Sequence, residues 1–260
     1  MSMEWFWLGQ AGFALRSAGR LVLIDPYLSD HLAVKYRGTD KPHDRLMPSP
    51  WLADEVRGVT AVLCSHRHGD HMDPIALPIL AQHNPQCRFI MPLAEVRSAP
   101  VAATGINAGE TLVVDGIQIT AIASAHEALE TNERGEHRFL GYMVKLEGAT
   151  LYHSGDCVPY EGLPERLRRE KVDVALLPVN GRGQGVLGNF TFDEAVALCR
   201  AAGIQALIVH HFGMFAFNTV ARAELERQAA GTAAPPRVTV PQAGEWNEWV
   251  FNRKGRSIHE

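Results

Sequence analysis

Residues 60–74 read TAVLCSHRHGDHMDP, a short apolar segment followed at once by a dense group of metal-binding side chains. The apolar segment Thr60–Cys64 has the length and composition of a buried strand. It is followed by four side chains in H-x-H-x-D-H spacing: His66, His68, Asp70 and His71. Chance alone would place roughly 0.001 such runs in a chain of this composition. Because imidazole and carboxylate groups bind divalent transition metals, the stretch predicts a metal site at the end of a strand.

The spacing within this run suits two ions better than one. In an extended loop, residues two apart project the same way, so His66 and His68 can bind one ion together. Asp70 and His71 then turn toward a neighbouring position. A metal held by this loop alone would have too few ligands, so we expect others from distant parts of the chain.

Further candidate ligands follow three other apolar segments. They are His126 after 117–124, Asp156 after 150–153, and the pair His210 and His211 after 204–209. Strand ends that converge on one edge of a sheet are where α/β proteins place their sites. Since a carboxylate can bridge two cations and an imidazole cannot, Asp156 is the predicted bridge. We expect His66, His68 and His126 around one ion, and Asp70, His71 and a histidine of the 210–211 pair around the other.

The rest of the chain reads as short strands interspersed with helices. Expected strands cover 3–8, 12–16, 21–24, 87–91, 111–114, 117–124, 141–146, 150–153, 172–177, 204–209, 237–240 and 246–251. Expected helices cover 50–56, 74–81, 163–171, 191–202 and 220–230, of which 191–202 has a capping box from Thr191 and Glu194 and a stop at Gly203. This many strands favours two packed sheets in a single domain spanning 1–260, of the α/β or the α+β class.

These motifs together resemble the metallo-β-lactamase superfamily. The resemblance implies a four-layer αββα sandwich of two mixed β-sheets flanked by helices, with the metal site at one edge. It also implies that Asp25, in WLGQAGFALRSAGRLVLIDPYLSD (residues 7–30), orients a ligand or has a structural role. The run His211-Phe-Gly-Met-Phe favours His211 over His210 as the ligand.

Within the superfamily, WLGQAGF, LYHSGDC and LLPVNGRG look most like the L-ascorbate-6-phosphate lactonase branch. Gln10 stands where relatives commonly have His, and Cys157 where many have Thr or Ser. Cys157 is expected to be a packed side chain, with a thiolate ligand as the alternative.

The predicted function is a metal-dependent hydrolase with two divalent metal ions, zinc or manganese, as cofactors. A metal-bridged hydroxide would attack a small ester, lactone or related anionic substrate, with Asp70 and Asp156 as catalytic residues. A phosphodiesterase or nuclease on the same scaffold is the alternative. In the glycine-rich loop 178–189, Asn180 and Arg182 are candidate substrate-binding residues, Arg182 as an anion clamp, although the loop could simply be a turn.

Composition and charge exclude several other classes. The net charge is −4 and there is no long basic run, so we expect a small-molecule substrate and no nucleic acid. Neither a signal peptide nor an apolar run of membrane-spanning length is visible, and four cysteines lack CxxC spacing, which predicts a cytoplasmic protein without membrane partners. A homo-oligomer is left open. Histidines such as His43 receive no role beyond surface or packing.

Overall fold

The computed structural model describes residues 2–182 and 188–250, and within them the strands form two seven-stranded sheets. The first sheet runs in the order β14 (Trp246–Val250), β1 (Ser2–Gly9), β2 (Gly12–Ser17), β3 (Arg20–Ile24), β4 (Val59–Leu63), β5 (Arg88–Pro92) and β6 (Thr104–Ile106). The second runs β13 (Arg237–Thr239), β12 (Ala206–His210), β11 (Val174–Pro178), β10 (Ala149–His153), β9 (Leu140–Leu146), β8 (Ile117–Ala123) and β7 (Thr111–Val114). Both sheets are mixed: strands β3 to β6 and β10 to β13 pair in parallel, and the others pair antiparallel.

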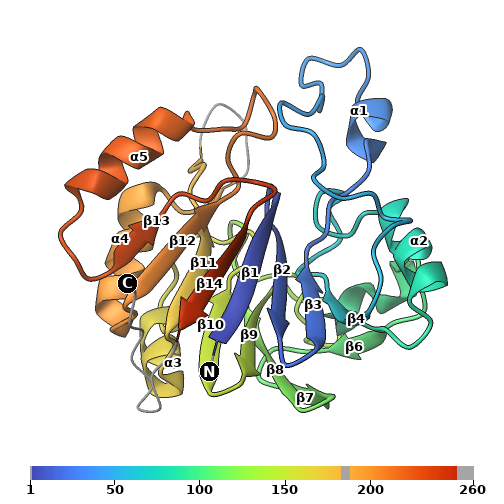
Figure 1. The fold of residues 1–260 in the computed structure, drawn as a ribbon, viewed down its shortest axis with the longest axis horizontal. Coiled ribbons are helices and arrows are strands. Elements are labelled where there is room, and N and C mark those ends of the chain that lie inside the picture. Colours follow the sequence, from blue (N-terminus) through green and yellow to red (C-terminus); the bar gives the residue numbers. More distant parts are fainter. Residues whose placement is uncertain (1, 183–187, 251–260) are drawn as a thin grey trace.

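Helices flank this pair of sheets on both sides (Figure 1). They are α1 (His31–Lys35), α2 (Ala76–His83), the 3-10 helix η1 (Leu93–Ser98), α3 (Leu163–Glu170), α4 (Phe192–Ala202) and α5 (Arg222–Gly231). Helix α4 packs on β11 and β12, and α5 packs on β13, whereas α2 lies on the far side against the first sheet. The predicted αββα sandwich is therefore confirmed. No helix within the described residues is both long and apolar enough to cross a bilayer.

The alternation of side chains along β1 divides the apolar core into layers. Trp5 and Trp7 point between the two sheets and belong to the large central core. Phe6 and Leu8 point the other way, into a second core beneath α2 that includes Leu77. This two-residue period is what a strand buried on both faces requires. Core packing thus explains the alternating aromatic residues of β1.

The segment between β3 and β4 differs from the sequence prediction. The helix expected over 50–56 is wrong, because only a turn forms there and Trp51 packs on Phe6 with ring centroids 4.7 Å apart. The short helix α1 was not predicted, nor were β6 and η1. Helix α1 has one buried side chain, Leu32, in a small cluster with Met214 and Phe215 from the far end of the chain. A single buried side chain gives no periodic signal, so this helix depends on tertiary contact.

Helix α4 follows its sequence signals closely. The side chain of Thr191 accepts from the Glu194 amide, and the Glu194 carboxylate accepts from the Thr191 amide, which completes the capping box. Gly203 ends the helix in the left-handed conformation, with φ of 75°. The predicted helix is thereby confirmed, with Thr191 as its N-cap and Phe192 as its first residue.

Candidate metal centre

The loop that follows β4 turns back on itself, so that its four metal-binding side chains face two adjacent positions. The amides of His71 and Met72 both donate to the carbonyl of His68, at 3.0 and 2.8 Å. Gly69 lies within this turn and leaves room for α1, since a Cβ there would come 2.8 Å from Cδ2 of Leu32. The turn therefore separates the first pair of candidate ligands from the second.

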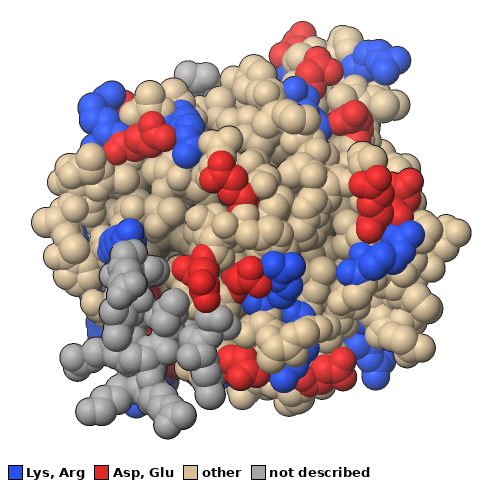
Figure 2. Space-filling model, viewed as in Figure 1, with Lys and Arg blue, Asp and Glu red and all other residues tan. Residues whose placement is uncertain are grey.

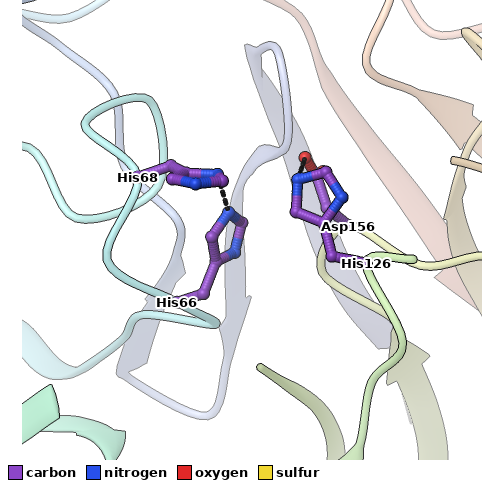
Figure 3. A group of neighbouring side chains, drawn as sticks. All are labelled: His66, His68, His126 and Asp156. Atoms are coloured by element: carbon purple, nitrogen blue, oxygen red, sulfur yellow. Dashed lines mark hydrogen bonds and ion pairs between the residues drawn. The ribbon is translucent and has the colours of Figure 1, made fainter. Parts of the chain in front are cut away.

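The first cluster consists of His66, His68, His126 and Asp156, from loops after β4, β8 and β10 (Figure 3). Their four candidate ligand atoms all lie within 4.8 Å of one another. Nε2 of His66 is 2.9 Å from Nδ1 of His68, and Nε2 of His126 is 3.6 Å from Oδ2 of Asp156. Bonds of about 2.0–2.2 Å at angles between 90° and the tetrahedral value would place ligand atoms about 2.8–3.6 Å apart. These separations fit a transition-metal ion.

The second cluster consists of Asp70, His71 and His211, with Asp156 beside it. Oδ2 of Asp70 lies 3.7 Å from Nε2 of His71 and 3.9 Å from Nε2 of His211. Oδ1 of Asp156 lies 3.3 and 3.2 Å from the same two nitrogens. Nε2 of His71 and Oδ1 of Asp156 are buried and have no hydrogen-bond partner among the described residues, which is the condition of atoms that would bind a cation.

Asp156 joins the two clusters because its carboxylate oxygens face in different directions. Oδ2 is directed at the first cluster and Oδ1 at the second. The structure thus brings together all seven predicted metal ligands in the two predicted groups. That they bind ions, and how many ions they bind, stays a prediction.

Asp25, at the end of β3, supports the second cluster from behind. Its Oδ2 is 2.7 Å from Nδ1 of His71, and both side chains are fully buried. The amide and hydroxyl of Ser65 donate to the two oxygens of Asp25, at 2.7 and 2.6 Å. Asp25 is thus placed to orient the ring of His71. Whether it orients a metal ligand or has only a structural role stays a prediction, as does metal binding by His71.

The electrostatics of the two clusters differ. Burial, reinforced by the nearby His71 and His68, holds the pKa of His66 well below its ordinary value. Burial would also lower the pKa of His71, but the carboxylates of Asp156, Asp70 and Asp25 raise it well above its ordinary value. Burial alone would raise the pKa of Asp156, yet the rings of His211 and His71 hold it well below its usual range. The metal-free protein therefore carries a neutral imidazole in the first cluster and a protonated one in the second.

Residues of both clusters line a cavity of about 700 Å³, namely His68, Asp70, His126, Asp156 and His211. Three cationic side chains line it, namely Lys35, Lys41 and Arg67. The aromatic part of the lining consists of Tyr36, His43, Phe215 and Phe217. Of the described residues that line the cavity, only Asp70 and Asp156 carry carboxylates, and both belong to the clusters.

The chain shares these features with a known protein family. Residues 20–212 match the family model described as the β-lactamase superfamily domain. The chain belongs to the metallo-β-lactamase superfamily. It is 28% identical over 248 residues to a UPF0173 metal-dependent hydrolase of Myxococcus xanthus, covering 92% of this chain and 80% of that protein.

Two solved structures show the same fold as this superfamily member. A metallo hydrolase of the archaeon Ignicoccus hospitalis has a TM-score of 0.72 at 18% identity and covers 97% of this chain and 100% of its own. An isothiocyanate hydrolase from Delia radicum gut bacteria has a TM-score of 0.76 at 20% identity, with 94% and 98% coverage. The chain is accordingly a metal-dependent hydrolase. The narrower resemblance to the L-ascorbate-6-phosphate lactonase branch stays a prediction.

The structure separates the two adjacent histidines of the superfamily's late motif. His211, with φ of 64°, directs its ring at the second cluster. His210 is buried on the opposite side, where its ring stacks on His153 at 4.8 Å and meets the edge of Phe13. Of the two, His211 is the one positioned as a ligand, as the sequence motif favoured.

The residues predicted to bind substrate lie outside the cavity lining. Arg182 forms an ion pair with Glu194 of α4 and donates to the carbonyl of Asn189 at 2.7 Å. Asn180 donates to Asn218, which does line the cavity, at 2.7 Å. The rest of their glycine-rich loop, residues 183–187, lies outside the described residues. Substrate binding by Asn180, and by Arg182 as an anion clamp, stays a prediction.

Other residues near the centre have roles that the sequence left open or did not reveal. Cys157 is fully buried and burial raises the pKa of its thiol to about 11, which favours the expected packed side chain over a thiolate ligand. His43 was assigned no role beyond surface or packing, and its ring lines the cavity packed against Tyr36. Gln10 reaches the second cluster from the turn between β1 and β2. The only sequence signal for Gln10 was that relatives commonly have His at this position of the WLGQAGF motif.

Proposed function

We propose that this protein hydrolyses a small anionic ester or lactone at a centre of two divalent ions. The observation that carries this proposal is Asp156, which lines the cavity and whose two oxygens face the two clusters. Two ions bound there would supply a hydroxide at neutral pH and polarise the carbonyl of the substrate.

The exposure of Asp70 and Asp156 suggests different catalytic roles for the two residues. The side chain of Asp156 is 6% exposed and lies between the clusters, which suits a bridging ligand. The side chain of Asp70 is 15% exposed and lines the cavity, so it can reach a reacting group. We therefore assign Asp70 as the residue that accepts and returns a proton, and Asp156 as the residue that holds both ions.

The cavity lining supports an anionic substrate. Lys35, Lys41 and Arg67 lie around the clusters, and the cavity contains no described carboxylate other than those of the clusters. These cations can bind a carboxylate or phosphate group at a distance from the reacting carbonyl. This role was predicted for Arg182, and the lysines at positions 35 and 41 are better placed for it.

The aromatic part of the lining supports a substrate with a flat or apolar portion. The ring of His43 stacks on Tyr36 at 4.1 Å and meets the edge of Phe217 at 4.6 Å. Burial lowers the pKa of His43, so this imidazole is neutral at pH 7 and behaves as part of the aromatic surface.

The charge distribution gives no support to a long nucleic-acid substrate. Figure 2 shows acidic and basic side chains interspersed over the face in view, without a continuous basic stripe among the residues described there. We therefore favour the small-molecule hydrolase over the nuclease alternative.

A metal analysis joined to a substrate panel tests this proposal. Protein purified without chelator is analysed for zinc, manganese and iron, and its activity is measured on anionic and neutral esters, lactones, a thioester, an isothiocyanate and bis-p-nitrophenyl phosphate. We expect two ions per chain and fastest turnover of an anionic ester or lactone. Fewer than two ions at saturation, or preference for the phosphodiester or for neutral substrates, would contradict the proposal.

A further inference from the structure

The turn between β1 and β2 places Gln10 against the second cluster in a strained but firmly held conformation. Gln10 has φ of 50°, in the left-handed region that residues with a side chain adopt at a cost. Its carbonyl accepts two hydrogen bonds, from the amide of His211 at 2.9 Å and from Nε1 of Trp7 at 3.0 Å. These bonds connect the Gln10 backbone directly to a residue of the cluster.

The side-chain amide of Gln10 lies among the candidate ligand atoms. Its Nε2 is 2.8 Å from Oδ2 of Asp70 and 3.1 Å from Nε2 of His211. The residue is 1% exposed, and its Oε1 is buried without a hydrogen-bond partner among the described residues. The hydrogen bonds to Asp70 and His211 therefore satisfy only one end of this buried amide.

The distances from the Gln10 amide to Oδ2 of Asp70 and to Nε2 of His211 match those between two ligand atoms of one metal ion. Donor atoms bound to one ion at about 2.0–2.2 Å and at right angles lie about 2.8–3.1 Å apart. The oxygen and nitrogen of an amide exchange places by rotation about one terminal torsion, and nothing in the carbon skeleton distinguishes them. With the amide rotated, Oε1 would occupy the position now held by Nε2.

A bound cation would reverse which end of the Gln10 amide, the NH₂ group or the oxygen, faces Asp70 and His211. Without it, the N–H groups of Gln10 face the acceptor atoms of Asp70 and His211. With it, those lone pairs belong to the cation, so an N–H group there would face a positive charge and an oxygen would be attracted to it.

We infer that Gln10 is a further ligand of the second ion, to which it presents its amide oxygen. This inference rests on the two-ion centre proposed above. The second ion would then have three oxygen donors, from Asp70, Asp156 and Gln10, and two imidazoles. The first would have three imidazoles and one carboxylate oxygen. Since carbonyl and carboxylate oxygens suit manganese, and imidazole-rich tetrahedral sites suit zinc, the second site should accept Mn²⁺ more readily than the first.

The alternative is that Gln10 only donates a hydrogen bond to Asp70 and keeps that carboxylate in place. The Gln10→Glu variant separates the two roles because glutamate has the same length but cannot donate when ionised. If position 10 supplies a ligand, the new carboxylate would add a charged oxygen to the second ion and preserve or strengthen its binding. If position 10 supplies only a donor, the carboxylate would face Asp70 with like charge and weaken the site at least as much as Gln10→Ala.

The experiment titrates metal-free wild type, Gln10→Ala and Gln10→Glu with Mn²⁺, followed by electron paramagnetic resonance, and with Zn²⁺ against a chromophoric chelator. Gln205→Ala is the matched control, because Gln205 is exposed and donates only to the nearby Gly203 carbonyl. We expect Gln10→Ala to weaken the second Mn²⁺ site about tenfold or more, with the first site unchanged. Gln10→Glu should bind the second ion at least as tightly as wild type.

Two results would overturn the inference. One is an unchanged second-site affinity in Gln10→Ala, and the other is weakened binding in Gln10→Glu. If Gln10→Ala does not fold, Gln10→Glu alone still decides between ligand and hydrogen-bond donor. A wild type that binds a single ion would instead contradict the proposed function, so the two failures are distinguishable.

Discussion

The carboxylate of Asp25 lies 2.7 Å from Nδ1 of His71, and both side chains are completely excluded from solvent. A carboxylate can only accept a hydrogen bond when ionised, so Nδ1 of His71 must carry a proton. Nε2 is then the nitrogen that faces the second cluster. This contact determines which atom of His71 is available for a metal.

Replacing Asp25 with asparagine should therefore weaken the second ion site. The amide can present either an oxygen or an NH₂ group to Nδ1, so the ring is no longer held in one tautomer. We expect the affinity for the second ion to fall about 10- to 100-fold, as measured by metal titration. Asp173→Asn, which alters a cap on the Thr150 amide away from the centre, should leave both affinities unchanged. Equal effects of the two variants would contradict this account.

Replacing Asp156 with asparagine should affect both ions. Asparagine has one oxygen in place of two and no charge, so it cannot bridge the clusters. We expect bound metal to fall from two ions to one or fewer. Turnover should fall by more than about 100-fold, which is the upper end of the loss seen when a hydrogen-bond partner of a metal ligand is removed. Metal content from elemental analysis, together with initial rates, checks this. Unchanged values for both would remove Asp156 from the centre.

Binding of the second ion should release a proton at neutral pH. Burial alone would lower the pKa of His71, but the surrounding carboxylates raise it well above its ordinary value of 6.5. A cation that binds His71 must therefore displace a bound proton. The apparent affinity for the second ion should therefore increase with pH until the raised pKa of His71 is reached. His66, whose pKa is lowered, is already neutral in this range and adds no such dependence.

Calorimetry in buffers of different ionisation enthalpy measures this release directly. We expect more protons to be released at pH 7 with the second ion than with the first, because the second ion displaces the proton of His71 and completes the two-ion centre that ionises a bound water. In the metal-free protein, the raised pKa of His71 also contributes stability that is present below about pH 6.5 and is lost as the pH rises through the raised value. A second-ion affinity that does not change between pH 6.5 and 8 would contradict this prediction.

Reversing the charge of the lysines in the cavity should change which substrates are used. In the double variant Lys35→Glu and Lys41→Glu, the KM of an anionic substrate should rise several-fold, in the range of about 0.2–1 kcal/mol for each exposed ion pair. The KM of a neutral ester should be unaffected. Arg37→Glu is the matched control because Arg37 is exposed on the same segment but is not among the residues that line the cavity. An equal effect on neutral and anionic substrates would show that these lysines do not select charge.

Two buried tyrosines offer a matched test of stability. The hydroxyl of Tyr142 donates to the carbonyl of Cys64 at 2.8 Å and ties β9 to the strand before the metal-binding loop. The hydroxyl of Tyr152 is buried without a hydrogen-bond partner among the described residues. We expect Tyr142→Phe to lower the free energy of unfolding by about 1–2 kcal/mol and Tyr152→Phe to leave it unchanged or raise it. Denaturant unfolding curves measure both, and the reverse order would contradict the assignment.

Much of the fold could be predicted because its strands are short, apolar and separated by clear turns. Helix α4 was predicted within its bounds because its capping box and terminal glycine are local signals. Helix α1 could not be, since it is stabilised by contacts of Leu32 with Met214 and Phe215, almost two hundred residues away in the chain. The helix predicted over 50–56 was wrong for the same reason, because the packing of Trp51 on Phe6 is a tertiary contact.

The sequence by itself determined the chemistry of the centre, because ligand type and spacing are local properties of the chain. His66, His68, Asp70 and His71 are recognisable from their spacing, and the distant ligands from their positions after apolar strands. Only the tertiary structure decided that His211 rather than His210 faces the cluster, that Lys35 and Lys41 line the cavity, and that Gln10 reaches Asp70. Those facts depend on how two sheets pack and where their loops converge, and no local pattern records such long-range distances.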